Sequence, residues 1–395
     1  MIFNTKTTDT ASTNPFLGKD YTLKDSRTQY LKYPNKLRIL TESQRKTRDS
    51  IYHDDSPENY EETNCLCNEI GQDILISEVD RHGLPYHKVI CTNCGLLRVS
   101  PRWKAQHYKT FYENHYRELY NPITGSKEET IARMATQESR KKIAAWVVES
   151  VARFGVRSSS IKIVEIGAGG GWNLANLSSQ WERVGYDVDE EFLAIGRKLF
   201  NISLKLGWLE EALVDVSDAD IILFSHVVEH FLKPHQALSK ITRVAKPSAL
   251  VLIEVPGIFR IHRTNLDPMS YMQNAHVYTF CSVTLKDVCE GSGLKVLSID
   301  ETVRSVCKKA NVSEEKKQVP SLISHPQLYQ HILRYLKMCE WGTRISLKLA
   351  QILGQNSLIL RLWKKSYFPL LQFLVPKLSS QSSSSKVVPQ SILND

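Results

Sequence analysis

The sequence predicts an α/β fold in which a parallel sheet is covered by helices on both faces. Three observations support this prediction. Apolar segments of strand length alternate with helical segments through residues 159–311, and such alternation is typical of βαβ units. A glycine-rich turn at residues 167–171 directly follows the first strand. An acidic residue, Asp187, ends the second strand, at the sheet edge where open α/β folds bind ligands.

Each expected element has a place along the chain. Apolar runs predict seven strands, at 161–167, 182–188, 202–207, 219–225, 249–256, 294–301 and 303–310. Helical spacing predicts helices between them, at 173–180, 190–200, 235–245 and 282–293. Before the first strand, apolar residues recur with helical spacing over 128–154 and predict a longer helix there.

The segments outside residues 159–311 differ from it in composition. Residues 1–60 are polar with weak apolar periodicity, so we expect a disordered leader. Residues 61–102 contain four cysteines, and residues 103–158 are expected to form connecting helices. Residues 312–378 have a basic, helical pattern. The Ser-rich residues 379–395 predict a disordered tail.

Charge is distributed unevenly along the 395 residues. The net charge is +9, and residues 304–395 alone carry 14 Lys/Arg against 4 Asp/Glu. The basicity therefore belongs to the C-terminal quarter, and the near-neutral core argues against a nucleic-acid partner. The start of the chain lacks an apolar signal core, and no run of 18 apolar residues predicts a membrane span. We therefore expect a cytoplasmic protein.

The glycine turn has the context of a ligand-binding loop. It reads Glu165-Ile-Gly167-Ala-Gly169-Gly-Gly171 between a strand and a helical segment. Missing Cβ atoms let a backbone turn sharply and approach a ligand closely. Asp187 follows one βα unit later, and its carboxylate can accept hydrogen bonds from ribose hydroxyls. A purely structural glycine turn is the alternative.

This E-x-G-x-G-x-G pattern resembles the first motif of class I S-adenosylmethionine-dependent methyltransferases. The resemblance implies a Rossmann-like seven-stranded sheet with S-adenosylmethionine held by the loop. A second block, Asp220 to Pro234, resembles the fourth motif of the same family. Carried onto this chain, the resemblance implies these cofactor-binding residues: Glu165, Gly167, Ala168, Gly169, Gly171, Asp187, Val188, Trp208, Leu209, Ser225 and His226.

Three histidines are candidates for a catalytic base. His226 and His230 belong to the second block, and His276 begins an H-x-x-x-F segment that resembles one in small-molecule O-methyltransferases. A hydroxyl acceptor needs a base, and histidine titrates near neutral pH. A structural role for each histidine remains an alternative. Glu229 either orients a neighbouring histidine or caps its own helix.

The cysteine segment predicts a structural zinc site. Cys65 and Cys67 are followed by Cys91 and Cys94, and Gly95 permits the turn of a zinc knuckle. Because the first pair is C-x-C, His82 or His87 could replace one thiolate, and four reduced cysteines in a β-rich subdomain are the alternative. The ending CGLLRVSPR resembles the N-terminal segment of methyltransferases that modify sugars in polysaccharide or antibiotic pathways.

These features predict methyl transfer to a small-molecule or glycan hydroxyl, with a sugar of polysaccharide or secondary-metabolite biosynthesis as the expected acceptor. A lipid-like or quinone acceptor at a membrane is one alternative, and a non-catalytic zinc-bearing scaffold is another. Basic and apolar residues alternate through 340–378. This pattern is compatible with peripheral membrane contact, with a helix packed on the core, or with a dimer contact.

Overall fold

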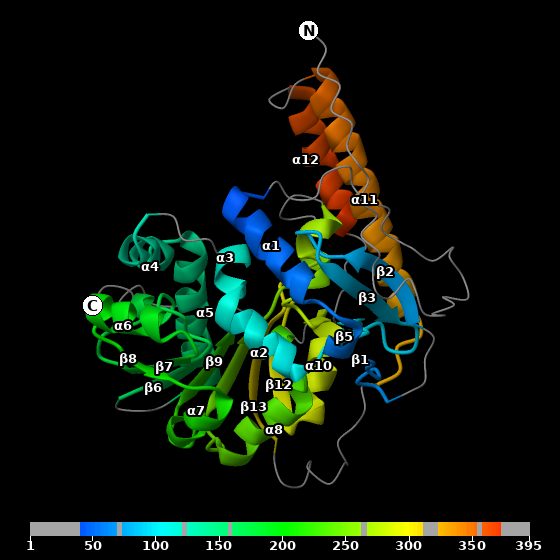
Figure 1. Ribbon diagram of the computed structural model, residues 1–395. Helices are drawn as coiled ribbons and strands as arrows, with labels where there is room; N and C mark the ends of the chain where they lie inside the picture. The colour runs from blue at the N-terminus through cyan, green and yellow to red at the C-terminus, as the bar shows by residue number, and fades with distance from the viewer. Residues whose placement is uncertain are drawn as a thin grey trace.

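The computed structural model describes residues 40–68, 73–120, 125–156, 160–261, 267–310, 323–353 and 358–372 (Figure 1). The first 39 residues of the expected leader and the expected tail at 379–395 lie outside these ranges. A seven-stranded sheet forms the centre, and helices lie on both of its faces. None of the described helices is long and apolar enough to cross a bilayer.

The central sheet has the strand order β12-β13-β10-β9-β6-β7-β8. Its strands are β6 (Lys162–Ile166), β7 (Glu182–Asp187), β8 (Ser203–Leu206), β9 (Ile221–Ser225), β10 (Leu250–Glu254), β12 (Leu294–Ile299) and β13 (Arg304–Lys309). All neighbours pair in parallel except at β13, which lies antiparallel between β10 and β12. The predicted fold class is confirmed, with β13 as the antiparallel exception.

The helices around this sheet follow the expected order. They are α4 (Lys127–Ala135), α5 (Glu138–Phe154), α6 (Glu190–Phe200), α7 (Leu209–Val216), α8 (Pro234–Val244) and α10 (Ser282–Gly291). The helix predicted over 128–154 is interrupted between α4 and α5, where Thr136 and Gln137 leave the helical pattern. The helix α7 was not predicted from the sequence.

The helix predicted at 173–180 is wrong. Only a 3₁₀ turn, Leu174–Asn176, forms there, and Leu177 is already extended. Both leucines are buried against the sheet. The side chain of Asn176 donates to the carbonyl of Ala135 at 2.9 Å, which ties this turn to the end of α4. Tertiary packing therefore overrides the local helical pattern.

A second, antiparallel sheet has the order β11-β4-β3-β2. Its strands are β2 (Asp73–Val79), β3 (Pro85–Cys91), β4 (Leu97–Val99) and β11 (Tyr278–Thr279). A small pair, β1 (Tyr60–Glu61) with β5 (Arg102–Trp103), lies beside it. Because β11 follows β10 of the central sheet in the chain, its pairing with β4 joins the cysteine segment to the main domain through the backbone.

The expectation of a disordered leader through residue 60 is wrong beyond residue 41. The helix α1 (Glu42–Asp54) begins there with a capping box between Thr41 and Gln44. The Gln44 amide donates to the carbonyl of Leu119 at 2.9 Å, and Ile51 is buried in the main core. These contacts attach α1 to α3, a partner that a local reading of the sequence does not reveal.

Several shorter elements connect the larger ones. These are α2 (Ala105–Asn114), α3 (Tyr116–Tyr120) and the 3₁₀ turns η1 (Pro57–Asn59), η2 (Leu174–Asn176), η3 (Val228–His230), η4 (Ile258–Arg260) and η5 (Pro268–Tyr271). Four of them, α2, α3, η3 and η5, contribute residues to the lining of one large cavity. This cavity is the candidate site.

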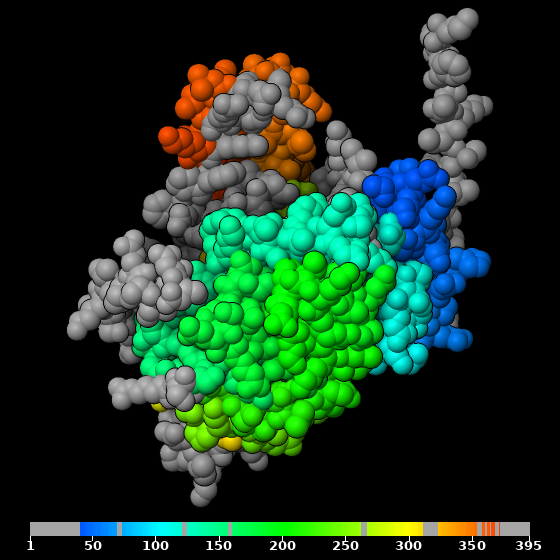
Figure 2. All heavy atoms as spheres, turned by 90° about the vertical axis from the view of Figure 1, so that its left-hand side faces the viewer, coloured from blue at the N-terminus to red at the C-terminus, as the bar shows by residue number. Residues whose placement is uncertain are grey.

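The chain ends, within the described residues, in a helical hairpin of α11 (Leu328–Leu353) and α12 (Leu358–Gln372). The hairpin extends away from the body of the molecule, in orange and red in both views (Figures 1 and 2). The two helices approach closely because Gly342 has no side chain at their contact. A Cβ there would lie 2.4 Å from the Tyr367 ring.

Candidate active site and cysteine cluster

A cavity of about 940 Å³ lies at the carboxyl ends of β6, β7 and β9. One side is formed by the glycine turn after β6 and the end of β7. The lining also includes tyrosines of α2 and α3 and the side chains of His226, His230 and His276. Because both groups of residues line one space, a ligand on the glycine turn and a second molecule among the histidines can meet.

The glycine turn owes its shape to backbone conformations that glycine adopts without strain. Gly167 and Gly169 have φ values of +74° and +56°. The amides of Gly167 and Ala168 both donate to the carbonyl of Tyr186, at 2.8 and 2.9 Å. The turn is therefore pinned to β7, the strand beside it in the sheet.

Asp187 organises the turn from the end of β7. Its Oδ2 accepts the amide of Gly169 at 2.7 Å, and its Oδ1 accepts the amide of Val188 at 2.8 Å. Burial raises the pKa of Asp187, while the Gly169 amide and the Arg117 charge oppose that shift. An ionised carboxylate has further acceptor positions, so Asp187 can still bind a ribose hydroxyl.

The predicted cofactor residues do not all reach the cavity. Those that line it are Gly167, Gly169, Asp187, Val188, Trp208, Leu209, Ser225 and His226. Glu165, Ala168 and Gly171 lie outside its lining, and both Glu165 and Ala168 are fully buried. Trp208 is 51 % exposed and Val188 41 % exposed. These two residues leave apolar surface available to a flat ring such as adenine.

Glu165 supports the turn from behind. Its Oε1 accepts a hydrogen bond from the side chain of Asn173 at 2.5 Å. Burial raises the pKa of Glu165 to about 7, although Asn173 and the charge of Arg140 act in the opposite direction. Glu165 therefore supports the glycine turn from the protein interior and does not line the cavity.

On the other side of the cavity, three histidines surround the carboxylate of Glu229. Its Oε1 lies 3.6 Å from His226 Nδ1, 3.9 Å from His230 Nε2 and 3.8 Å from His276 Nε2. Glu229 is 1 % exposed, and neither carboxylate oxygen has a hydrogen-bond partner among the described residues. The three histidine candidates therefore form one cluster with Glu229 at its centre.

The three histidines differ in their surroundings. Burial lowers the pKa of His230, and it lowers that of His276 further. Burial also acts to lower the pKa of His226, but contact with Glu229 and the charges of Glu229 and Glu254 outweigh it, so this pKa is raised. The Nδ1 atom of His230 lies 2.7 Å from the carbonyl oxygen of Ala275. That contact places the proton on Nδ1 and leaves Nε2 as an acceptor.

Comparison with known protein families supports the fold and the chemistry. Residues 133–299 match the family model described as a methyltransferase domain. Residues 133–299 of the chain are therefore a methyltransferase domain. No curated protein matches it. The matched range includes the glycine turn, Asp187 and the histidine cluster. These cavity residues of the methyltransferase therefore lie inside the matched domain.

Several solved structures are similar in part. The plantazolicin methyltransferase BpumL, solved with SAH, is 15 % identical over 48 % of this chain and 78 % of its own, with a TM-score of 0.37. CalS10, an amino pentose methyltransferase from Micromonospora echinaspora, is 11 % identical over 48 % and 98 %, with a TM-score of 0.34. A SAM-dependent methyltransferase from Aquifex aeolicus is 16 % identical over 47 % and 98 %, with a TM-score of 0.33.

Sequence analysis missed the tyrosine wall of the methyltransferase. Tyr112, Tyr116 and Tyr120 line the cavity from α2 and α3. Neighbouring rings lie 5.1 and 5.4 Å apart between centroids. The Tyr112 hydroxyl also contacts His230 Nδ1 at 2.8 Å. The i, i+4, i+8 spacing of these tyrosines was a signal that they share one helical face.

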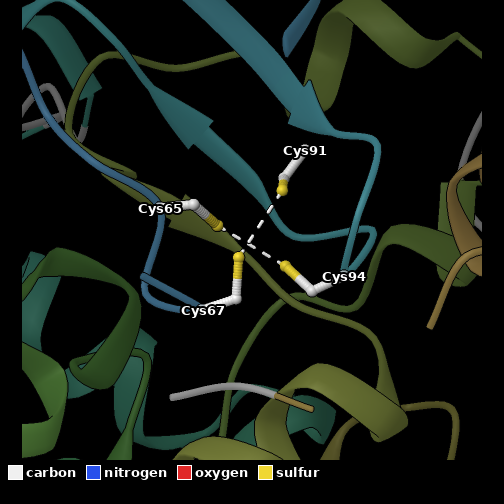
Figure 3. A group of neighbouring side chains, drawn as sticks. All are labelled: Cys65, Cys67, Cys91 and Cys94. Carbon is white, nitrogen blue, oxygen red and sulfur yellow. Dashed lines mark hydrogen bonds between the residues drawn. The ribbon is translucent and has the colours of Figure 1, made fainter. Parts of the chain in front are cut away.

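The four N-terminal cysteines come together as a separate, buried cluster (Figure 3). Their sulfur atoms point toward one another, and all lie within 4.8 Å. Cys65 and Cys94 Sγ are 3.4 Å apart, and Cys67 and Cys91 Sγ are 3.8 Å apart. Neither His82 nor His87 belongs to this group; His82 instead lies 3.7 Å from Asp80. Gly95 closes the knuckle turn with φ +74°.

Proposed function

We propose that the methyltransferase transfers a methyl group from S-adenosylmethionine to a hydroxyl of a sugar, either nucleotide-linked or part of a glycan. The observation that carries this proposal is the shared cavity. It joins the glycine turn and Asp187 to a Glu229-centred histidine cluster. A hydroxyl acceptor needs such a base, since its proton must leave as the new bond forms.

The acceptor side of the cavity suits a sugar. The tyrosine wall lines this space with aromatic rings, and Ser270 and Gln273 line it with polar groups. Pockets that combine aromatic walls with a few polar groups orient small polar ligands well. A quinone would use the same rings, so the assay below includes the outcome that separates this second acceptor class from a sugar.

Among the three histidines we propose His230 as the base. Its Nδ1 proton is held by the Ala275 carbonyl, so Nε2 is ready to accept a proton. The carboxylate of Glu229, 3.9 Å away, would stabilise the imidazolium that results. His226 and His276 contact the same carboxylate and complete the cluster. Glu229 acts through His230 and is a positioning residue.

Bound S-adenosylmethionine supplies a methyl group on a positively charged sulfur, which is a good leaving group. Asp187, Trp208 and the glycine turn would hold its ribose, adenine and methionine parts. The acceptor oxygen would take the methyl group as S-adenosylhomocysteine leaves, and the hydroxyl proton would pass to His230 Nε2. Alignment of acceptor, methyl and sulfur supplies most of the rate gain.

The test is a turnover assay with a panel of nucleotide-linked sugars and glycan fragments, read as S-adenosylhomocysteine formed and acceptor mass gained. His230→Gln and Glu229→Gln should lower kcat by roughly 10²- to 10⁴-fold, with affinity for S-adenosylmethionine unchanged. His235→Gln, on α8 and outside the cavity lining, is the matched control. Full turnover by His230→Gln would remove His230 as the base. Methylation of a quinone but of no sugar would favour the alternative acceptor.

We also propose that Cys65, Cys67, Cys91 and Cys94 hold a structural zinc ion. A tetrahedral zinc with sulfur ligands separates the sulfurs by about 3.8 Å, close to the 3.4 and 3.8 Å observed. All four thiols are buried. Four protein ligands leave no open position for chemistry. The ion would hold the loop before β2 to the turn between β3 and β4.

A further inference from the structure

The α11–α12 hairpin divides into a part that packs on the body and a part that does not. In α11 the buried residues are Ile332, Leu333, Tyr335, Leu336, Cys339 and Gly342. From residue 343 to 353 none is buried. In α12 the buried residues among the described side chains are Tyr367 and Leu371, at the end remote from the connection between the helices. In both helices, the half next to the connection between α11 and α12 therefore extends beyond the core.

The packed half is a firm base for the hairpin. The Tyr367 hydroxyl donates to the carbonyl of Met338 at 2.8 Å. Its ring stacks on Trp363 at 4.8 Å between centroids, and it packs against Gly342. Since these contacts fix the two helices together, the exposed halves are held out as one unit.

Apolar side chains concentrate where the hairpin is most exposed. Ile352 is 78 % exposed, Leu358 70 % and Ile359 57 %. Leu353 and Leu362 add to the same surface, at 40 % and 54 %. We call these five residues the apolar tip. Large exposed aliphatic residues are costly in water, and their concentration marks an interaction surface.

Basic residues form a collar behind the apolar tip on both helices. Lys348 lies one turn before Ile352 on α11, and Lys365 lies two turns after Leu358 on α12; both lysines are exposed. Residues 341–378 contain six Lys/Arg and no Asp or Glu. An apolar end with a basic collar matches the layers of a bilayer surface, where acyl chains lie beneath anionic headgroups.

We propose that the apolar tip of the α11–α12 hairpin enters the interface of a bilayer that contains anionic lipids, with Lys348 and Lys365 at the level of the headgroups. A protein partner or a second copy of the chain would also cover apolar residues. The uniform positive charge around the tip favours a lipid surface, because two identical copies would bring like charges together. This inference does not depend on which acceptor the methyltransferase uses.

The test is co-sedimentation of the full chain with vesicles, either of phosphatidylcholine alone or with about 30 mol % phosphatidylglycerol, at low and high salt. Binding is expected to anionic vesicles and to weaken at least about tenfold at high salt. Two variants address the two layers: Ile352→Ser/Leu358→Ser/Ile359→Ser for the apolar tip, and Lys348→Glu/Lys365→Glu for the collar. Each should weaken partitioning by roughly tenfold or more.

Matched controls carry the same kinds of change elsewhere on the surface. Leu199→Ser/Val214→Ser replaces two other exposed aliphatic residues, and Lys141→Glu/Lys198→Glu reverses two other exposed lysines. Both should bind vesicles within about twofold of the unaltered chain. Equal binding by tip variants and controls would overturn the proposal. So would failure of the unaltered chain to bind vesicles, or a dimer in solution that the tip variant converts to monomer.

Discussion

The backbone amide of Gly169 donates to Asp187 Oδ2 at 2.7 Å and joins the glycine turn after β6 to the end of β7. The same carboxylate accepts the amide of Val188 through its other oxygen. One side chain thus holds the turn in place before any ligand arrives. Preorganisation of this kind lowers the ordering cost of binding.

Asp187→Ala should therefore weaken binding of S-adenosylmethionine by about tenfold or more, because it removes both a ribose acceptor and the support of the turn. Asp187→Asn keeps one oxygen for the Gly169 amide and should lose less. Isothermal titration of the two variants beside the unaltered chain measures this order. Equal affinity in all three would show that Asp187 neither holds the turn nor meets the cofactor.

Glu165 should make the stability of the ligand-free protein depend on pH. Its pKa is raised to about 7 in the folded chain from 4.5. The unfolded chain therefore loses this proton at a lower pH than the folded chain does. The contribution of Glu165 to the free energy of unfolding is fully present below pH 4.5 and is lost as the pH rises through 7. Glu165→Gln should be more stable than the unaltered chain by about 3 kcal/mol at pH 8, and by less than about 1 kcal/mol at pH 5.

Urea unfolding of both proteins from about pH 5 to about pH 8.5 measures that difference. The amide side chain introduced by Glu165→Gln retains an oxygen for Asn173, so the hydrogen bond is preserved while the charge is removed. A stability difference that does not grow with pH would contradict the raised pKa of Glu165.

The cysteine cluster should retain one zinc ion per chain through purification. Cys94→Ser should reduce the zinc content and lower Tm by more than about 5 °C, because metal binding and folding are linked. A strong chelator should have the same effect on the unaltered chain. Cys281→Ser changes a buried thiol outside the cluster and should keep the zinc. Elemental analysis that finds no zinc in the folded, unaltered chain would contradict the zinc site and indicate four reduced thiols instead.

Gly342→Ala should destabilise the hairpin, although alanine is the better helix former by about 1 kcal/mol. The added methyl would lie 2.4 Å from the Tyr367 ring, and overpacking of this kind costs about 1–3 kcal/mol. The double change Gly342→Ala/Tyr367→Leu removes the ring and should recover part of the loss. Thermal unfolding measures both. A rise in Tm for the single variant would show that α12 shifts at little cost to accommodate the added methyl group.

Local patterns in the sequence were sufficient for the central sheet. Apolar runs predicted β9 and β10 within two residues, and the range 190–200 matches α6. The glycine turn and Asp187 were found for the same reason, since their roles depend on neighbours in one βα unit. The helix expected at 173–180 failed because the burial of Leu174 and Leu177 outweighed local propensity.

Contacts between distant segments could not be predicted in this way. The sequence by itself determined the fold class, the glycine turn with Asp187, the four cysteines and the three histidine candidates. Only the tertiary structure decided that Glu229 is the common neighbour of those histidines, that β11 pairs with β4, and that the tyrosine wall lines the same cavity as the glycine turn. The physical reason is that a period of two or 3.6 residues reports which face is buried, whereas the partner of that face depends on how the whole chain packs.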